Sequence, residues 1–178
     1  MIADSMKAPE AGMDSASLVV LCDCSGSMTG PPIRRLREQL TEALKGVKGA
    51  RIAAFSTGAK WVDGPESLPE PDGSTNLTAG LKLALSLWPG TCLVISDGLP
   101  DDQESALEVA AVFPGEVSTI FCGNAESERD RKGLEFLRRL ARVGGGSFVH
   151  RNLHGGLSIT GAVRAMLAIE GPKTITVS

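Results

Sequence analysis

The chain has 178 residues, a net charge of −3 and 22% charged residues of both signs. The length fits one domain, and the mixed charge excludes both an acidic tail and a strongly basic nucleic-acid binder. Because only 4% of the residues are aromatic, we expect a core built mainly from Leu, Val, Ile and Ala.

Short apolar runs alternate along the chain with longer amphipathic segments. The apolar runs predict strands that are covered on both faces, and apolar side chains repeated every three or four residues predict helices. In chain order, we expect a strand at 18–22, a helix at 33–47, strands at 51–55 and 60–62, a helix at 77–88, a strand at 92–95, a helix at 103–113, a strand at 117–122, a helix striped from 134 to 141, a strand at 147–150 and a helix at 157–169. Residues 1–15 are predicted to be a flexible lead-in, 16–170 the domain and 171–178 a tail.

This alternation predicts right-handed connections and a doubly wound α/β domain, with a mostly parallel, Rossmann-like sheet and helices on both faces. In such sheets ligands bind at the carboxyl ends of the strands, beside the point where the strand order reverses. The residues that directly follow the apolar strands are therefore the candidates for a functional site.

Three polar groups lie at those places. Asp23, Ser25 and Ser27 follow the first strand, Thr75 precedes the helix at 77–88, and Asp97 follows the strand at 92–95. If these two strands are neighbours, Asp23 and Asp97 emerge side by side. Two adjacent carboxylates repel each other, and a divalent cation relieves that repulsion. Mg²⁺ prefers oxygen ligands and keeps several waters, so hydroxyls as direct ligands with the carboxylates one water away would suit it.

The residues around these groups match a known pattern. The motifs Asp23-Cys-Ser25-Gly-Ser27-Met28, Gly73-Ser-Thr75-Asn76-Leu77 and Ile95-Ser96-Asp97-Gly98 resemble the metal-ion-dependent adhesion site of von Willebrand factor A domains. The resemblance extends from about residue 17 to residue 169. It implies a Rossmann-like fold with a short antiparallel edge strand, which would be the strand at 60–62.

The resemblance also implies a role for each residue of the site. Ser25 and Ser27 would be direct metal ligands, Thr75 would bind directly or through water, and Asp23 and Asp97 would bind through water. The ion would be Mg²⁺ or Mn²⁺. Ser74 stands where the family often has a second glycine, a departure that removes no ligand.

We therefore expect a divalent-cation-dependent protein–protein interaction module that is not an enzyme. The partner protein would supply an Asp or Glu carboxylate to the metal, and neither nucleic acid nor a membrane is expected as a partner. No signal peptide and no membrane-spanning run is visible in the sequence, so the expected location is cytoplasmic. The resemblance suggests a bacterial intracellular assembly, associated with ATPases or with stress and defence systems.

Several alternatives remain open at this point. A Mg²⁺-dependent phosphohydrolase could use Asp23 as its nucleophile, but such enzymes generally need a second carboxylate two residues later, where this chain has Ser25. Cys22 and Cys24 could form half of a zinc site, yet no second pair of Cys or His lies at ligand spacing. His150 and His154 are expected at a strand end and in a loop. Two clusters of arginines are predicted to be solvated helix faces: Arg34, Arg35 and Arg37, and Arg138, Arg139 and Arg142.

Overall fold

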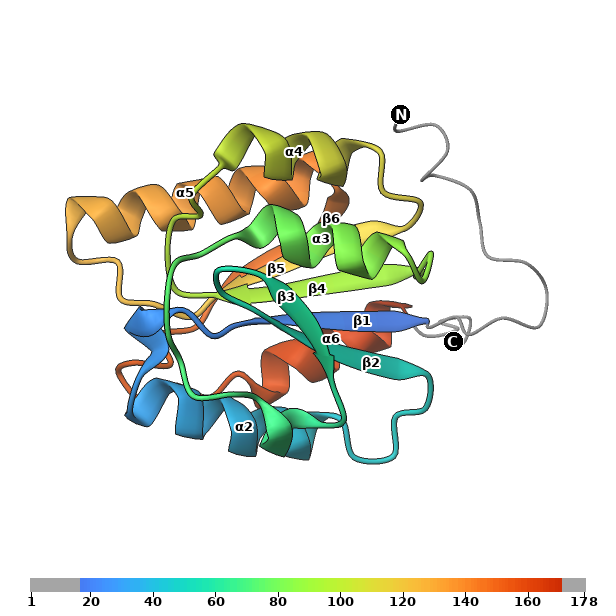
Figure 1. The fold of residues 1–178 in the computed structure, drawn as a ribbon. Helices are drawn as coiled ribbons and strands as arrows, with labels where there is room; N and C mark the ends of the chain where they lie inside the picture. The colour runs from blue at the N-terminus through green and yellow to red at the C-terminus, as the bar shows by residue number, and fades with distance from the viewer. Residues whose placement is uncertain (1–16, 171–178) are drawn as a thin grey trace, which may run out of the picture.

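The computed structural model describes residues 17–170, which form a six-stranded sheet between two layers of helices (Figure 1). The strands are β1 (Leu18–Asp23), β2 (Ala50–Phe55), β3 (Ala59–Val62), β4 (Thr91–Ser96), β5 (Glu116–Phe121) and β6 (Gly145–His150). The helices are α2 (Pro31–Ala43), α3 (Leu77–Leu85), α4 (Gln103–Ala111), α5 (Glu128–Val143) and α6 (Thr160–Glu170), with short 3-10 turns η1 (Gly26–Met28) and η2 (Pro65–Ser67). The predicted lead-in at 1–15 and the predicted tail at 171–178 lie outside the described residues.

The strands lie in the order β3-β2-β1-β4-β5-β6. Every neighbouring pair is parallel except β2 and β3, which are antiparallel. The chain winds outward from β1 in one direction and from β4 in the other, so the strand order reverses between these two strands. The predicted doubly wound α/β fold is confirmed, and so is the antiparallel edge strand.

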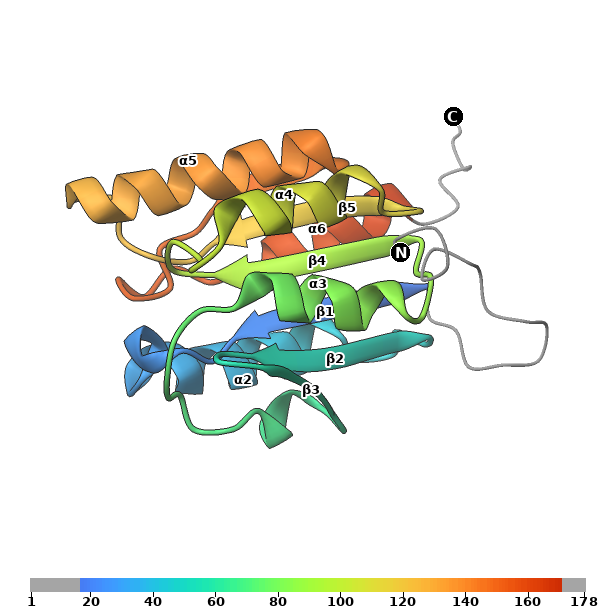
Figure 2. The ribbon, with the colours of Figure 1, turned by 45° about the horizontal axis from the view of Figure 1, so that its top comes forward.

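The sheet separates two hydrophobic cores. Helices α2 and α6 cover one face, and α3, α4 and α5 cover the other (Figures 1 and 2). Successive residues of β1 point to opposite faces, so that Val20 lies in the first core and Leu21 in the second. Both faces of β1 and β4 are buried, which explains why their residues 18–22 and 92–95 are all apolar.

Several helix ends differ from the sequence-based prediction. Helix α5 begins at Glu128, before the predicted stripe at 134, and α4 ends at Ala111 rather than at 113. Helix α2 ends at Ala43 rather than at 47, and the chain turns through Gly46, whose φ is +76°. Helix α3 ends at Leu85, after which the Trp88 amide donates to the Leu85 carbonyl in a tight turn. Helix α6 begins at Thr160 rather than at 157. After α2 and α3 the apolar periodicity continues past the last helical residue, because Leu44 and Trp88 of the following turns also pack on the cores. Leu157 before α6 is exposed and packs on neither core.

Both ends of the described chain lie at the same edge of the sheet. Strand β1 begins there, and α6, which runs back from the opposite edge after β6, ends there (Figures 1 and 2). The carboxyl ends of the parallel strands form the other edge. The residues predicted to form the functional site therefore lie far from both ends of the described chain.

Candidate metal centre

The two candidate carboxylates emerge from neighbouring strands at the point where the strand order reverses. Asp23 is the last residue of β1, and Asp97 directly follows β4. These strands are parallel, with Cys22 opposite Ile95. The structure thus brings Asp23 and Asp97 together as expected from the sequence, because each follows an apolar strand at the same edge of the sheet.

Asp23 is completely buried. Its Oδ1 accepts a hydrogen bond from the Ser25 amide (2.8 Å), and its Oδ2 accepts one from the Ser96 hydroxyl (2.6 Å). Burial and the nearby charge of Asp97 raise the pKa of Asp23 from 3.8 to about 6, although these hydrogen bonds act in the opposite direction. A negative charge on Asp23 is therefore unfavourable in the protein without a cation.

Asp97 is also nearly buried, and each of its oxygens has a protein donor. Its Oδ1 accepts from the Ser27 hydroxyl at 2.8 Å. Its Oδ2 lies 2.8 Å from Nε2 of His154, which donates when the proton is on that nitrogen. His154 belongs to the loop between β6 and α6. The Arg35 guanidinium of α2 donates to two carbonyls of this loop, those of Leu153 and His154.

The candidate hydroxyl ligands lie on two loops that are bound to each other. The hydroxyl oxygens of Ser25 and Ser27 are 3.4 Å apart. The backbone amide of Gly26 donates to the Gly73 carbonyl (3.1 Å), which joins this loop to the one that carries Thr75. Gly73 has a φ of +78°, a conformation that glycine adopts without strain. Backbone geometry therefore places the two loops, and the side chains do not have to hold them together.

A hollow of about 220 Å³ opens beside these loops, and the loops that follow β4, β5 and β6 and the first turn of α5 form the rest of its wall. Of the five residues predicted for the site, Ser27, Thr75 and Asp97 line it. Asp23 and Ser25 do not line the hollow and are buried. The structure thus divides the predicted set into three groups that face the opening and two that lie beneath it.

The donor set fits a hard divalent cation. Within residues 17–170, no group of three or more His, Cys, Asp or Glu side chains is placed to hold a metal ion, so a site here depends on hydroxyl oxygens. Ser25, Ser27 and Thr75 supply them. In the described part of the chain neither Asp23 nor Asp97 forms an ion pair with Lys or Arg. A cation among these groups would stabilise both buried carboxylates, as expected for Mg²⁺ or Mn²⁺.

Sequence reasoning gave no role in the site to two residues of this cluster, Ser96, which belongs to the third motif, and His154. Each could have been found from its place in the chain, because each lies at the carboxyl end of a strand or in the loop that follows one. As expected from the sequence, His150 ends strand β6 and His154 lies in the loop that follows, and the two side chains have different partners. Nε2 of His150 lies 3.0 Å from the Gly123 carbonyl oxygen, and its ring packs against Phe121.

Replacing His154 with alanine should destabilise the metal-free protein. The substitution removes a donor from the buried Asp97 carboxylate, and a lost hydrogen bond to a buried charged group costs about 1–3 kcal/mol. His154→Gln keeps an amide donor and should recover part of that loss. Urea unfolding of the three proteins in EDTA measures the effect. Equal stability of His154→Ala and the natural protein would show that the hydrogen bond contributes nothing.

The four cysteines are free and buried. Burial raises the pKa of Cys24 to about 12 and that of Cys22 and Cys122 well above the usual value, so their thiols stay protonated at neutral pH. Cys22 and Cys122 pack in the core between the sheet and helices α2 and α6.

The chain forms a Rossmann-like α/β domain, which is the fold that the resemblance to von Willebrand factor A domains implied. One solved structure that it resembles is an aerotolerance-related membrane protein from Bacteroides fragilis, crystallised with multiple mutations to serine. The two share 15% sequence identity and superpose with a TM-score of 0.60 over 87% of this chain and 100% of the other. At this identity the likeness shows a common fold only.

Two further comparisons gave no match: no family model and no curated protein matches the sequence. Among the described residues, no helix is long and apolar enough to cross a membrane.

Proposed function

We propose that this domain binds a divalent cation, Mg²⁺ or Mn²⁺, at the carboxyl edge of the sheet and, through it, a carboxylate of a partner protein. One observation carries the proposal. Two buried carboxylates, Asp23 and Asp97, lie at neighbouring strand ends beside three hydroxyls, and among the described residues the histidine His154 is the one basic side chain that contacts either of them. Burial of charges that are not fully balanced is costly, and a bound cation would remove that cost.

Each residue would have a role in metal binding that follows from its position. Ser25, Ser27 and Thr75 would hold the ion through their hydroxyls, and Asp23 and Asp97 would balance its charge. A bound ion would supply an electrophilic centre for the partner's Asp or Glu. Neutral hydroxyls support this proposal, because they leave most of the positive charge of the ion available to an incoming carboxylate.

The buried position of Asp23 argues for binding rather than for catalysis. A nucleophilic aspartate must reach its substrate, whereas both oxygens of Asp23 accept hydrogen bonds from Ser25 and Ser96 beneath the hollow. We therefore propose an interaction module that acts in a cytoplasmic, bacterial assembly, associated with an ATPase or with stress and defence. The aerotolerance-related neighbour is consistent with the last of these settings.

Calorimetric titration with Mg²⁺ and with Mn²⁺ tests the metal site. We expect one ion per chain, and at least about tenfold weaker binding to Ser27→Ala, which removes an exposed candidate ligand. Ser86→Ala is the matched control, because Ser86 is the C-cap of α3 and only bonds the Leu83 carbonyl. Equal affinity of the natural protein and Ser27→Ala, or no binding of either ion, would contradict the proposal.

A further inference from the structure

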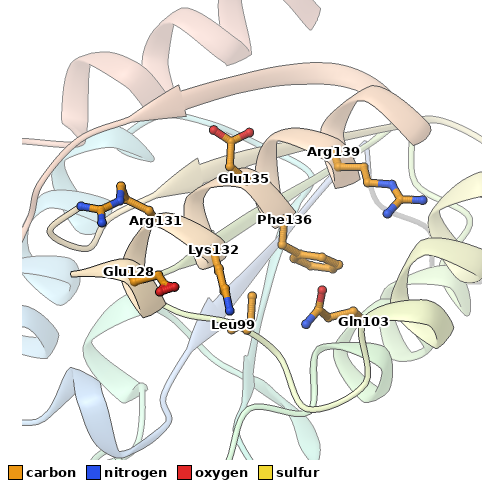
Figure 3. Close-up of a pocket in the computed structure, with 8 residues that line it drawn as sticks. All are labelled: Leu99, Gln103, Glu128, Arg131, Lys132, Glu135, Phe136 and Arg139. Atoms are coloured by element: carbon orange, nitrogen blue, oxygen red, sulfur yellow. The ribbon is translucent and has the colours of Figure 1, made fainter. Parts of the chain in front are cut away.

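A second hollow, of about 380 Å³, lies between the start of α4 and helix α5 (Figure 3). Its lining residues are Leu99, Gln103, Glu128, Arg131, Lys132, Glu135, Phe136 and Arg139. Figure 3 shows the side chains of Lys132 and Phe136 extending from α5 toward Leu99 and Gln103. None of the residues that line this hollow is among those predicted for the metal site.

The second hollow adjoins the candidate metal site. Leu99 lines both hollows, and the first turn of α5 contributes to both, with Arg129 to one and Glu128 to the other. Helix α5 also packs directly on the loop that follows Asp97. A Cβ atom added at Gly133 would lie 3.1 Å from the carbonyl carbon of Gly98. One extended segment of a partner could therefore cross from one hollow to the other within a few residues, at about 3.3 Å per residue.

The second hollow combines an apolar floor with a positively charged rim. Phe136 is 5% exposed and forms the floor with Leu99. Three cations and two carboxylates surround it, and one carboxylate, that of Glu135, pairs with Arg138 at 3.0 Å. The rim therefore has an excess of positive charge on a protein whose net charge is −3. Arg139, predicted from the sequence to lie on a solvated helix face, contributes to this rim.

We propose that this hollow binds the same partner segment whose carboxylate meets the metal, an inference that rests on the proposed function. The segment carries a Leu, Ile or Phe that fills the apolar floor and a further Asp or Glu that pairs with Lys132 or Arg139. A single contact between a carboxylate and a metal cannot select one protein among many acidic ones. An apolar side chain in a shaped pocket supplies that selectivity.

The charges on the rim favour a protein segment with one or two acidic side chains over a nucleic acid. Glu128, Glu135 and, in the adjoining hollow, Asp130 would repel a nucleic acid more strongly, because it carries a phosphate at every nucleotide. The floor suits one aliphatic or aromatic side chain flanked by carboxylates. The cations at the ends of the hollow are then positioned to pair with acidic residues on either side of that side chain.

The probe is a displayed library of random peptides of about twelve residues, selected on the natural protein in Mg²⁺. We expect the selected peptides to combine Asp or Glu with Leu, Ile or Phe. A synthetic copy should bind Arg139→Glu at least about tenfold more weakly than the natural protein. Arg142→Glu is the matched control, since it makes the same charge change on an exposed residue one turn further along α5, outside the hollow.

The outcomes separate this proposal from the metal-binding function. If EDTA abolishes binding and Arg139→Glu leaves it unchanged, the proposed role of the second hollow is overturned and the metal-binding function is retained. If Arg139→Glu weakens binding and EDTA leaves it unchanged, the proposed metal function is overturned. The proposal that one segment spans both hollows is then overturned too. Selection of basic peptides or of none, or tighter binding of single-stranded nucleic acid of similar length, also overturns the proposal.

Discussion

Asp23→Asn should increase the stability of the metal-free protein at neutral pH and abolish its binding of divalent cations. The amide keeps the shape of the carboxylate but carries no charge, so the costs of burial and of the nearby Asp97 disappear. We expect a gain on the order of 2 kcal/mol in the free energy of unfolding. Urea unfolding in EDTA measures the gain, and calorimetry with Mg²⁺ measures the loss of binding.

Asp63→Asn is the control for this substitution. Asp63 is exposed, and its change to asparagine should alter stability by less than about 0.5 kcal/mol and leave metal binding intact. A clear destabilisation by Asp23→Asn would contradict the prediction. It would mean that the hydrogen bonds from Ser25 and Ser96 stabilise the charged carboxylate by more than burial and Asp97 destabilise it.

Without metal, the stability of the natural protein relative to Asp23→Asn should fall as the pH rises from about 4 to about 6. The pKa of Asp23 is 3.8 in its ordinary state and about 6 in the folded protein. Between these values the folded state binds more protons than the unfolded state, so a rise in pH favours unfolding. The slope is roughly 1 kcal/mol per pH unit, and the difference becomes constant above the folded pKa.

Urea unfolding of both proteins in EDTA at several pH values measures this difference. Other carboxylates titrate in the same range, and some act in the opposite direction. Hydrogen bonds from Ser105 lower the pKa of Asp102, for example. The effects of carboxylates that do not interact with Asp23 are common to both proteins and cancel in the difference. A difference that is flat, or that grows as the pH rises, would show that Asp23 is not destabilised by its surroundings.

The pairing of Asp23 with Asp97 could be predicted from the sequence, because it depends on strand order. The continuous apolar runs of β1 and β4 required a sheet covered on both faces, and such sheets have their ligand site where the strand order reverses. The helix caps could also be predicted. Asn76 accepts a hydrogen bond from the Ala79 amide and Asp102 one from the Ser105 amide, as such side chains do at helix starts.

The contacts of His154 with Asp97 and of α5 with the Gly98 loop could not be predicted in the same way. Both contacts depend on how a loop or a helix packs in three dimensions. No periodic pattern in the sequence indicates that His154 lies close to Asp97 or that α5 lies close to the Gly98 loop. The division of the site into exposed and buried groups has the same cause. Ser25 and Ser27 are two residues apart in one motif, yet Ser25 is 3% exposed while Ser27 lines the hollow.

The common edge at which β1 begins and α6 ends determines how this domain can be joined to other polypeptides. A domain fused directly before Leu18 or directly after Glu170 would be attached on the side away from Ser27, Thr75 and Asp97. A connection made at Leu18 or at Glu170 would therefore leave the proposed metal site accessible to a partner. Binding measurements on immobilised or fused protein should reproduce those on the free domain.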